Sequence, residues 1–277
     1  MTRFALFVDG SNLVGCCRDM AVKIDDYQSF YRFIYEQSVD VWKEAVAAVS
    51  PATQLRRVYW YEIGSMDEWD LNDPKNQAYL RERFDADRET KRGYMAVVGP
   101  KMPGEPQDKV TQEAWSLCFK EFREWYQKKR DLLDGMKRFQ HAVRTGTDLI
   151  DIIPSGHWKV DFLTRTLTEK GVDASLAVDM VALADNYDVA IVFSGDADSI
   201  PSINYLKRQN KHIGAVEFVS GYPPEKKGKA FSSRLKLAVD FVVRIYEMDL
   251  VSKEVARKAD YSKAAAPFDL PAKEPST

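Results

Sequence analysis

The sequence predicts an α/β fold in which helices cover both faces of a mainly parallel sheet. Residues 3–8 and 189–193 are continuous apolar runs, the pattern of strands that are buried on both faces. Residues 27–49 carry apolar and aromatic side chains at largely helical spacing, as an amphipathic helix packed on a sheet does. Each of the two strand runs stops at acidic residues. Because ligands of open α/β sheets bind outside the carboxyl ends of the strands, we expect a functional site at that edge.

Composition limits the class of protein. The chain has 277 residues, of which 45% are hydrophobic, so it can bury a large core, and we expect one domain over residues 1–250 that carries an insertion. Forty basic against 42 acidic residues give a formal charge of -2, so any nucleic-acid contact must use local patches. Three cysteines are too few, and wrongly spaced, for a disulfide framework or a CxxC metal site. Since no apolar run approaches the ~18 residues of a membrane span, the sequence indicates a soluble, cytoplasmic protein without a membrane partner.

The first strand run ends in Asp9-Gly10-Ser11-Asn12 and leads into a short helix. Ser11 or Asn12 can cap the exposed backbone donors of that helix. A helix N-terminus beside Asp9 would favour a bound phosphate. After the 27–49 helix, residues 55–63 are rich in β-forming side chains and predict a second strand.

Between residues 64 and 147 the pattern changes, and we expect a helical insertion. Asp73 and Pro74 form a cap and first-turn pair for a charged helix through about residue 92, and residues 94–98 are a candidate short strand. Residues 109–144 carry the longest helical signal in the chain. The aromatic stripe of that helix is expected to pack inward and consists of Trp115, Phe119, Phe122 and Tyr126.

The same long helix is locally basic, and its candidate phosphate contacts are Lys128, Lys129 and Arg130. Two interpretations stay open at this point. One is a solvated helix face over an aromatic seam, a common arrangement in surface helices. The other is an arm near the acidic edge that contacts the phosphates of a polynucleotide.

After the insertion, residues 148–154 predict a strand that returns to the sheet, and residues 155–157 predict a turn towards the acidic edge. His157 has no second His or Cys at ligand spacing, so it does not favour a zinc site. The rest of the chain predicts a helix behind Pro201, a last strand, a closing helix and a disordered tail, at residues 203–208, 213–219, 235–251 and 252–277 respectively.

Three motifs carry a family resemblance. They are FVDGSN at residues 7–12, EKGVD at 169–173 with Asp179 behind it, and SGDAD at 194–198. In this order they resemble the motifs of the NYN domain, in the LabA-like branch of the PIN-like nuclease superfamily. The resemblance covers residues 1–63 and about 148–250. It implies a Rossmann-like three-layer α/β/α sandwich and a metal-dependent cleavage of RNA, either single-stranded or structured, by a protein that can form homo-oligomers.

Position by position, the resemblance also implies roles for the site residues. The implied metal ligands are Asp9, Asp179 and Asp196. The implied additional catalytic acids are Asp173 and Asp198. The polar residues on the substrate side are Ser11, Asn12 and Ser194. Ser199 departs from the aromatic residue that the family pattern predicts after Asp198, which bears on substrate fit more than on catalysis.

The geometry of an ideal helix separates two of these acids. Asp173 and Asp179 lie six positions apart (179 − 173), which is roughly 240° around a helix, so both cannot face one ion if the segment is helical. Asp173 can serve as a helix cap instead, and we therefore favour Asp179 as the metal ligand.

The chemistry of phosphodiester hydrolysis explains why acids would gather at this edge. Mg²⁺ or Mn²⁺ takes oxygen ligands, lowers the pKa of an attacking water and neutralises charge on the phosphorus centre. Without a cation, neighbouring carboxylates would repel one another and raise one another's pKa. An acidic cluster without basic partners is therefore an argument for a metal ion.

Three alternatives belong to other classes of protein. A phosphatase of the haloacid dehalogenase type needs a second Asp two positions after the first, where this chain has Ser11. A topoisomerase-primase fold would use Asp196 and Asp198, but it fits Asp9 with Asn12 poorly. A non-catalytic RNA-binding or regulatory scaffold stays open, because a fold can persist without its activity.

Overall fold

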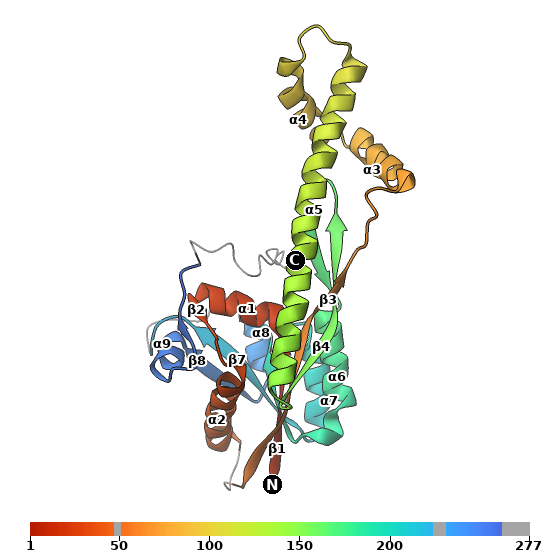
Figure 1. Cartoon of the computed structure of the whole chain (residues 1–277). Helices are drawn as coiled ribbons and strands as arrows, with labels where there is room; N and C mark the ends of the chain where they lie inside the picture. Colours follow the sequence, from red (N-terminus) through yellow and green to blue (C-terminus); the bar gives the residue numbers. More distant parts are fainter. Residues whose placement is uncertain (47–50, 224–230, 262–277) are drawn as a thin grey trace. The chain divides into compact units, whose positions relative to one another are not determined.

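The computed structural model describes residues 1–46, 51–223 and 231–261 (Figure 1). Its main sheet has the strand order β5-β4-β3-β1-β6-β7-β8. The strand β1 pairs in parallel with β3 and β6, β6 with β7, and β7 with β8. The prediction of an α/β fold with a mainly parallel sheet is therefore confirmed. The strand bounds are β1 Thr2–Asp9, β3 Thr53–Met66, β4 Ile150–Asp161, β5 Thr166–Lys170, β6 Val189–Phe193, β7 His212–Val219 and β8 Phe241–Tyr246.

The chain divides into two compact units, each described by itself. In the described part of the chain, the first unit comprises residues 1–64, 136–156 and 170–261, and the second comprises residues 65–135 and 157–169. Helices of the first unit are α1 Gly10–Asp19, α2 Tyr27–Ala45, α6 Val172–Ala182, α7 Ile200–Arg208, α8 Ser233–Ala238 and α9 Glu247–Ser252. Two short strands, β2 Val22–Lys23 and β9 Arg257–Lys258, form a separate antiparallel pair.

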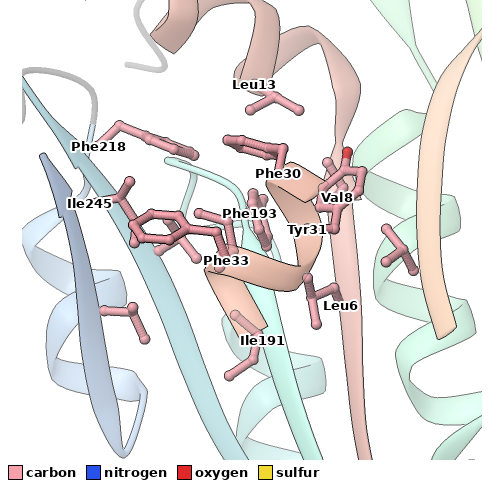
Figure 2. Packing of buried hydrophobic residues seen from close by; sticks show 14 of the residues in the cluster. Leu6, Val8, Leu13, Phe30, Tyr31, Phe33, Ile191, Phe193, Phe218 and Ile245 are labelled. Carbon is pink, nitrogen blue, oxygen red and sulfur yellow. The ribbon is translucent and has the colours of Figure 1, made fainter. Parts of the chain in front are cut away.

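The core of the first unit lies between α2 and one face of the sheet. Leu6 and Val8 of β1 are fully buried against aromatic side chains of α2 (Figure 2). Because successive residues of a strand point to opposite faces, Phe7 lies on the other face, where its ring meets those of Tyr59 and Tyr187. Helices α6 and α7 cover that second face (Figure 1). Burial on both faces explains why β1 and β6 are apolar without alternation.

The second unit has an aromatic core of its own. Its helices are α3 Pro74–Ala86, α4 Arg88–Val98 and the first part of α5, which spans Gln107–Gly146 in full. The Phe122 ring stands edge-on to Phe162 at 4.7 Å, and the Phe84 ring lies 5.7 Å from Trp115. The inward packing predicted for the stripe is confirmed for its three buried members, Trp115, Phe122 and Tyr126. Phe119 is only partly buried, and its ring lies under the Arg123 guanidinium.

The start of α1 differs from the prediction. Its cap is Asp9, not Ser11 or Asn12, since Asp9 Oδ1 accepts the backbone N–H of Asn12 at 2.9 Å. The helix begins directly after the last strand residue. The carboxylate at the strand end therefore also accepts a backbone N–H of the first helical turn. The next predicted helix, 27–49, is α2 and ends at Ala45; residues 47–49 lie outside the described residues.

Two predictions within residues 73–98 are corrected. The Asp73–Pro74 start is confirmed, but the helix ends at Ala86 rather than near residue 92. Asp87 then caps a new helix by accepting the N–H of Thr90 at 2.8 Å. Residues 94–98, predicted as a strand, form the last turns of this helix, α4. A local cap therefore outweighs the β-forming side chains of that segment.

The turn predicted at residues 155–157 is wrong, because these residues continue β4. Gly156 serves close packing instead of a turn: a Cβ there would lie 2.6 Å from Ile63 Cδ1. A Cβ at Gly64 would likewise lie 2.4 Å from the carbonyl oxygen of Pro154. The two glycines thus let the backbones of β3 and β4 approach.

The C-terminal part of the chain holds a strand that the sequence did not predict. Residues 235–251, predicted as one closing helix, instead form α8, β8 and α9, so 213–219 is not the last strand. The six residues of β8 alternate in burial, and short apolar runs do not distinguish strand from helix by period alone. Residues 252–261 of the predicted disordered tail include β9, and the rest of that tail lies outside the described residues.

Arg3 and Asp188 join the amino ends of β1 and β6. Asp188 Oδ2 accepts the Arg3 backbone N–H at 2.8 Å, and Oδ1 accepts Nη2 at 2.8 Å. The side-chain hydrogen bond from Arg3 lowers the pKa of the Asp188 carboxyl, although burial opposes the ionised form. The stability that a carboxylate with a lowered pKa supplies is complete above its unfolded pKa of about 3.9 and is lost as pH falls through the folded pKa.

We therefore expect Asp188→Asn to lower the melting temperature by a few degrees at pH 7. The difference from the wild type should shrink as pH falls below about 3.9, where the wild type also loses the charge. Thermal melts across this range measure it, with the exposed Asp40→Asn of α2 as control. If the melting temperature of Asp188→Asn stays below that of the wild type at low pH, the charge of Asp188 does not supply the stability.

Candidate metal centre

Parallel pairing brings the first and third motifs to one edge of the sheet. Val8 pairs with Phe193, so Asp9 and Ser194 follow at the same level. Asp9 is fully buried, and its Oδ1 holds the first turn of α1. Ser194 is buried, and its Oγ accepts the N–H of Asp196 at 3.1 Å. The bond from Asp196 to Ser194 thus ties the loop after β6 to the residue that ends the strand.

Three carboxylates converge beside this loop. Asp173, Asp196 and Asp198 each offer an oxygen, and these oxygens lie within 4.8 Å of one another. Two oxygens that bind one Mg²⁺ at about 2.0–2.1 Å can be up to about 4.2 Å apart, and two that bind a larger divalent ion at about 2.6 Å can be up to about 5.2 Å apart, so separations within 4.8 Å are close to what one divalent ion can bridge. Asp173 and Asp196 are partly buried, which strengthens the repulsion between them unless a cation is present. The three residues therefore form a set of hard oxygen donors suited to a divalent ion.

Gly171 explains how Asp173 reaches this group. Gly171 is the N-cap of α6 and has a φ of 94°, a left-handed conformation that glycine adopts at little cost. The helix then begins at Val172, and Asp173 stands in its first turn rather than serving as its cap. The sequence predicted Asp173 as a possible cap residue, but Gly171 holds the cap position and the carboxylate of Asp173 belongs to the acidic group.

Asp179 lies elsewhere on α6. Its Oδ2 accepts the hydroxyl of Tyr61 at 3.0 Å, and Tyr61 pairs with Asp9 across β3 and β1. Burial raises the pKa of the Tyr61 hydroxyl, and the charge and hydrogen bond of Asp179 raise it further, so this hydroxyl stays a donor. Among the described residues, the structure thus groups Asp173, not Asp179, with Asp196 and Asp198. The 240° separation expected on a helix is what divides the two.

Glu62 is an acid of this edge that sequence reasoning missed. It is 6% exposed, and a Cβ built on Gly10 would lie 2.2 Å from its Oε1 and 2.4 Å from Trp60 Nε1. The Glu62 carboxylate therefore lies against the start of α1, beside the residue that follows Asp9. A negative group at a helix N-terminus is stabilised by the helix dipole. The only signal in the sequence was a single charge inside the apolar run of β3.

His157 belongs to the second unit and takes part in a local hydrogen-bond chain. Its Nε2 lies 2.8 Å from Asp67 Oδ1, and its Nδ1 lies 2.9 Å from Ser65 Oγ. Asp67 Oδ2 accepts the N–H of Val160 at 2.9 Å. Burial opposes ionisation of Asp67, but the bonds from Val160 and His157 outweigh it and lower the pKa of the carboxyl. Both nitrogens of the imidazole thus have partners within their own unit.

The candidate phosphate contacts on α5 are accessible. Lys128 and Arg130 are exposed and Lys129 is half-buried.

The polar residues predicted to face a substrate, Ser11 and Asn12, lie in the first turn of α1. The amide oxygen of Asn12 lies 3.7 Å from Cys16 Sγ.

Part of the chain that carries this acidic group is similar to a known domain family. Residues 123–244 match the family model described as the NYN domain. This range covers 122 of the 277 residues (244 − 123 + 1), so the similarity to the NYN domain extends over less than half of the chain. The matched range begins within α5 and ends within β8, so the NYN match includes Asp173, Asp179, Asp196 and Asp198, whereas Asp9 precedes it. The predicted resemblance is confirmed at this level, and the LabA-like branch stays a prediction.

A search of the curated proteins finds no match. Among solved structures, the chain is similar to a protein of unknown function from Vibrio parahaemolyticus, with a TM-score of 0.40 and 17% identity over 88% of this chain and 93% of that chain. Within the described residues, no helix combines the length and the apolar character needed to span a membrane.

The contact between Gly10 and Glu62 yields a stability prediction. Gly10→Ala should destabilise the protein by about 1–3 kcal/mol, because the added methyl group meets a buried carboxylate and a rigid indole. Gly15→Ala in the same helix is the matched control, since a Cβ there meets nothing within 4 Å, and it should stabilise by about 0.5–1 kcal/mol. Urea unfolding of both variants measures the difference. If the two variants change the free energy of unfolding equally, the side chains of Glu62 and Trp60 move aside from the added methyl group without cost.

Proposed function

We propose that this protein is a metal-dependent nuclease that hydrolyses phosphodiester bonds of RNA. The observation that carries the proposal is the convergence of three carboxylates at the carboxyl edge of the sheet, inside the range that matches the NYN domain. NYN domains typically act on RNA and depend on divalent metal ions. We also propose that the substrate is cytoplasmic RNA. Because the chain as a whole has a formal charge of -2, contacts with this RNA would use local basic patches.

Asp173, Asp196 and Asp198 would hold Mg²⁺ or Mn²⁺. A divalent ion bound there supplies a water of lowered pKa and offsets negative charge on the reacting phosphate. The residues of the chain do the positioning. Ser194 fixes the backbone of Asp196, and buried Asp9 fixes the start of α1, where Ser11 and Asn12 would face the substrate.

Asp179 has a separate part in this proposal. Its hydrogen bond to Tyr61 ties α6 to β3 and so sets the rotation of the helix that carries Asp173. We accordingly favour Asp179 as a positioning residue over the metal-ligand role that the family resemblance implies.

This division predicts different behaviour for Asp173 and Asp179 of α6, and the same behaviour for Asp173 and Asp196. Asp173→Asn and Asp196→Asn should reduce cleavage by about a hundredfold or more, because each removes a ligand that stabilises the transition state. Both should also lose the rise in melting temperature on adding Mn²⁺, while melting at an equal or higher temperature than the wild type in EDTA. The measurements are cleavage of a structured RNA and thermal melts with and without metal.

Asp179→Asn is the matched control from the same helix. It should keep the Mn²⁺-dependent rise, because the amide can still accept the Tyr61 hydroxyl. If Asp179→Asn abolishes the rise while Asp173→Asn retains it, the metal assignment reverts to Asp179. If neither the wild type nor any variant cleaves RNA with Mn²⁺, but all of them bind RNA in EDTA, the protein is a non-catalytic RNA-binding scaffold instead.

The basic face of α5 gives a prediction about binding alone. If Lys128, Lys129 and Arg130 contact phosphates, changing all three to Ala should reduce the slope of log K against log salt by about 0.7 for each contact. The rate at saturating RNA should change little, because these groups would hold substrate and transition state equally. Titrations at several salt concentrations measure the slope. An unchanged slope would place these side chains in solvent only.

A further inference from the structure

Glu217 of β7 is a buried carboxylate with two basic partners. It is 1% exposed, and its Oε1 accepts Lys236 Nζ at 2.6 Å while Oε2 accepts Arg244 Nε at 3.2 Å. Burying a carboxylate is costly unless it is paired and hydrogen-bonded. Two cations on one carboxylate leave a local excess of one positive charge. The proposed cleavage does not require this arrangement, so it calls for another explanation.

The position of Glu217 places this excess charge at the carboxyl edge. Val192 of β6 pairs with Ala215 of β7, and Glu217 lies two residues beyond that pair, at the level of Ser194. By strand alternation Glu217 shares a face of the sheet with Ala215 and Val192, and Phe7 pairs with Val192 on the same face, two residues before Asp9. The acid and its two cations thus belong to the same edge and the same face as the start of the 194–198 loop.

Helix α8 is attached to this loop directly. The N–H of Ser232 donates to the carbonyl of Gly195 at 3.0 Å, and the N–H of Lys236 donates to the carbonyl of Ser232 at 3.1 Å. At the other end of the helix, Lys207 Nζ donates to the carbonyl of Ala238 at 2.9 Å. Lys236 is therefore fixed one helical turn away from a contact with the residue that precedes Asp196.

The cations of this group remain accessible although the acid does not. The side chains of Lys236 and Arg244 are 31% and 59% exposed, against 1% for that of Glu217. The ring of Phe231 lies 5.3 Å from Lys236 Nζ, which adds an aromatic surface beside the ammonium group. A nucleotide offers the matching chemistry, an anionic phosphate next to a base that can stack.

We propose that Lys236 and Arg244, positioned by Glu217, bind a phosphate of single-stranded nucleic acid next to the acidic group. Three neighbouring carboxylates repel an incoming phosphodiester, and cations at the same edge offset that repulsion. Glu217 keeps both cations paired with itself, so that they do not neutralise the acids. The proposal deepens the proposed function by naming a subsite, and it rests on that function for the identity of the polymer.

Lys236→Gln tests the subsite through binding in EDTA, where turnover does not enter. We expect about tenfold weaker binding of a fluorescent oligouridylate, because a charge-assisted contact is lost, and a salt slope smaller by about 0.7. Lys236→Arg should restore most of the affinity. The matched control is Lys211→Gln, a lysine at the other end of β7 whose Nζ donates to the carbonyl of Tyr187. It should bind as the wild type does.

Glu217→Gln separates positioning from bulk charge. The variant makes the protein more positive, so a non-specific attraction would strengthen binding, whereas loss of positioning weakens it.

Normal affinity and salt slope in folded Lys236→Gln would overturn the proposal. If the wild type binds through Lys236 but never cleaves RNA with Mn²⁺, the subsite stands and the nuclease proposal fails. Weaker binding of oligothymidylate by Lys236→Gln to the same degree would show that the subsite contacts phosphate and not the 2′-hydroxyl.

Discussion

The parallel pairing of β1 with β6 is the constraint on which this edge depends. Because both strands are buried on both faces, a slip of one residue would exchange the side chains that pack against α2 with those that pack on the opposite face, and would disrupt the close packing of both layers. The register therefore fixes Asp9 and the 194–198 loop at one level. Arg3 and Asp188 fasten the same two strands at their amino ends, so the alignment is held at both ends of the pair.

Each charged group at the carboxyl edge of the first unit has a distinct environment. Asp9 is buried and caps α1, and Glu62 is buried beside the same helix start. Glu217 is buried with two cations. Asp173, Asp196 and Asp198 approach one another, and Asp196 also accepts the backbone N–H of Ala197. Asp9, Glu62 and Glu217 are thus matched to backbone donors, a helix terminus or basic side chains, and the closely spaced set is the one suited to an ion.

The sequence predicts those features that depend on neighbours along the chain. The strands at Val189–Phe193 and 55–63, the Asp73 cap and the long helix α5 follow from local pattern. Glu62 and Glu217 do not, because their importance arises from contacts with Gly10 and Lys236 in other elements. The strand β8 escaped prediction for a related reason, since its six residues carry too little periodicity to exclude a helix.

Two aspartates on one helix show how a conformational detail decides chemistry. With Gly171 in the left-handed region, α6 begins at Val172 and Asp173 emerges in the first turn, towards Asp196. Six positions later, Asp179 emerges on a different side and meets Tyr61. Gly171 thus takes the cap position and leaves Asp173 in the first turn, on the side of α6 where Asp196 and Asp198 lie. The conformation of one glycine and the pitch of the helix together decide which acid of the motif joins the acidic group.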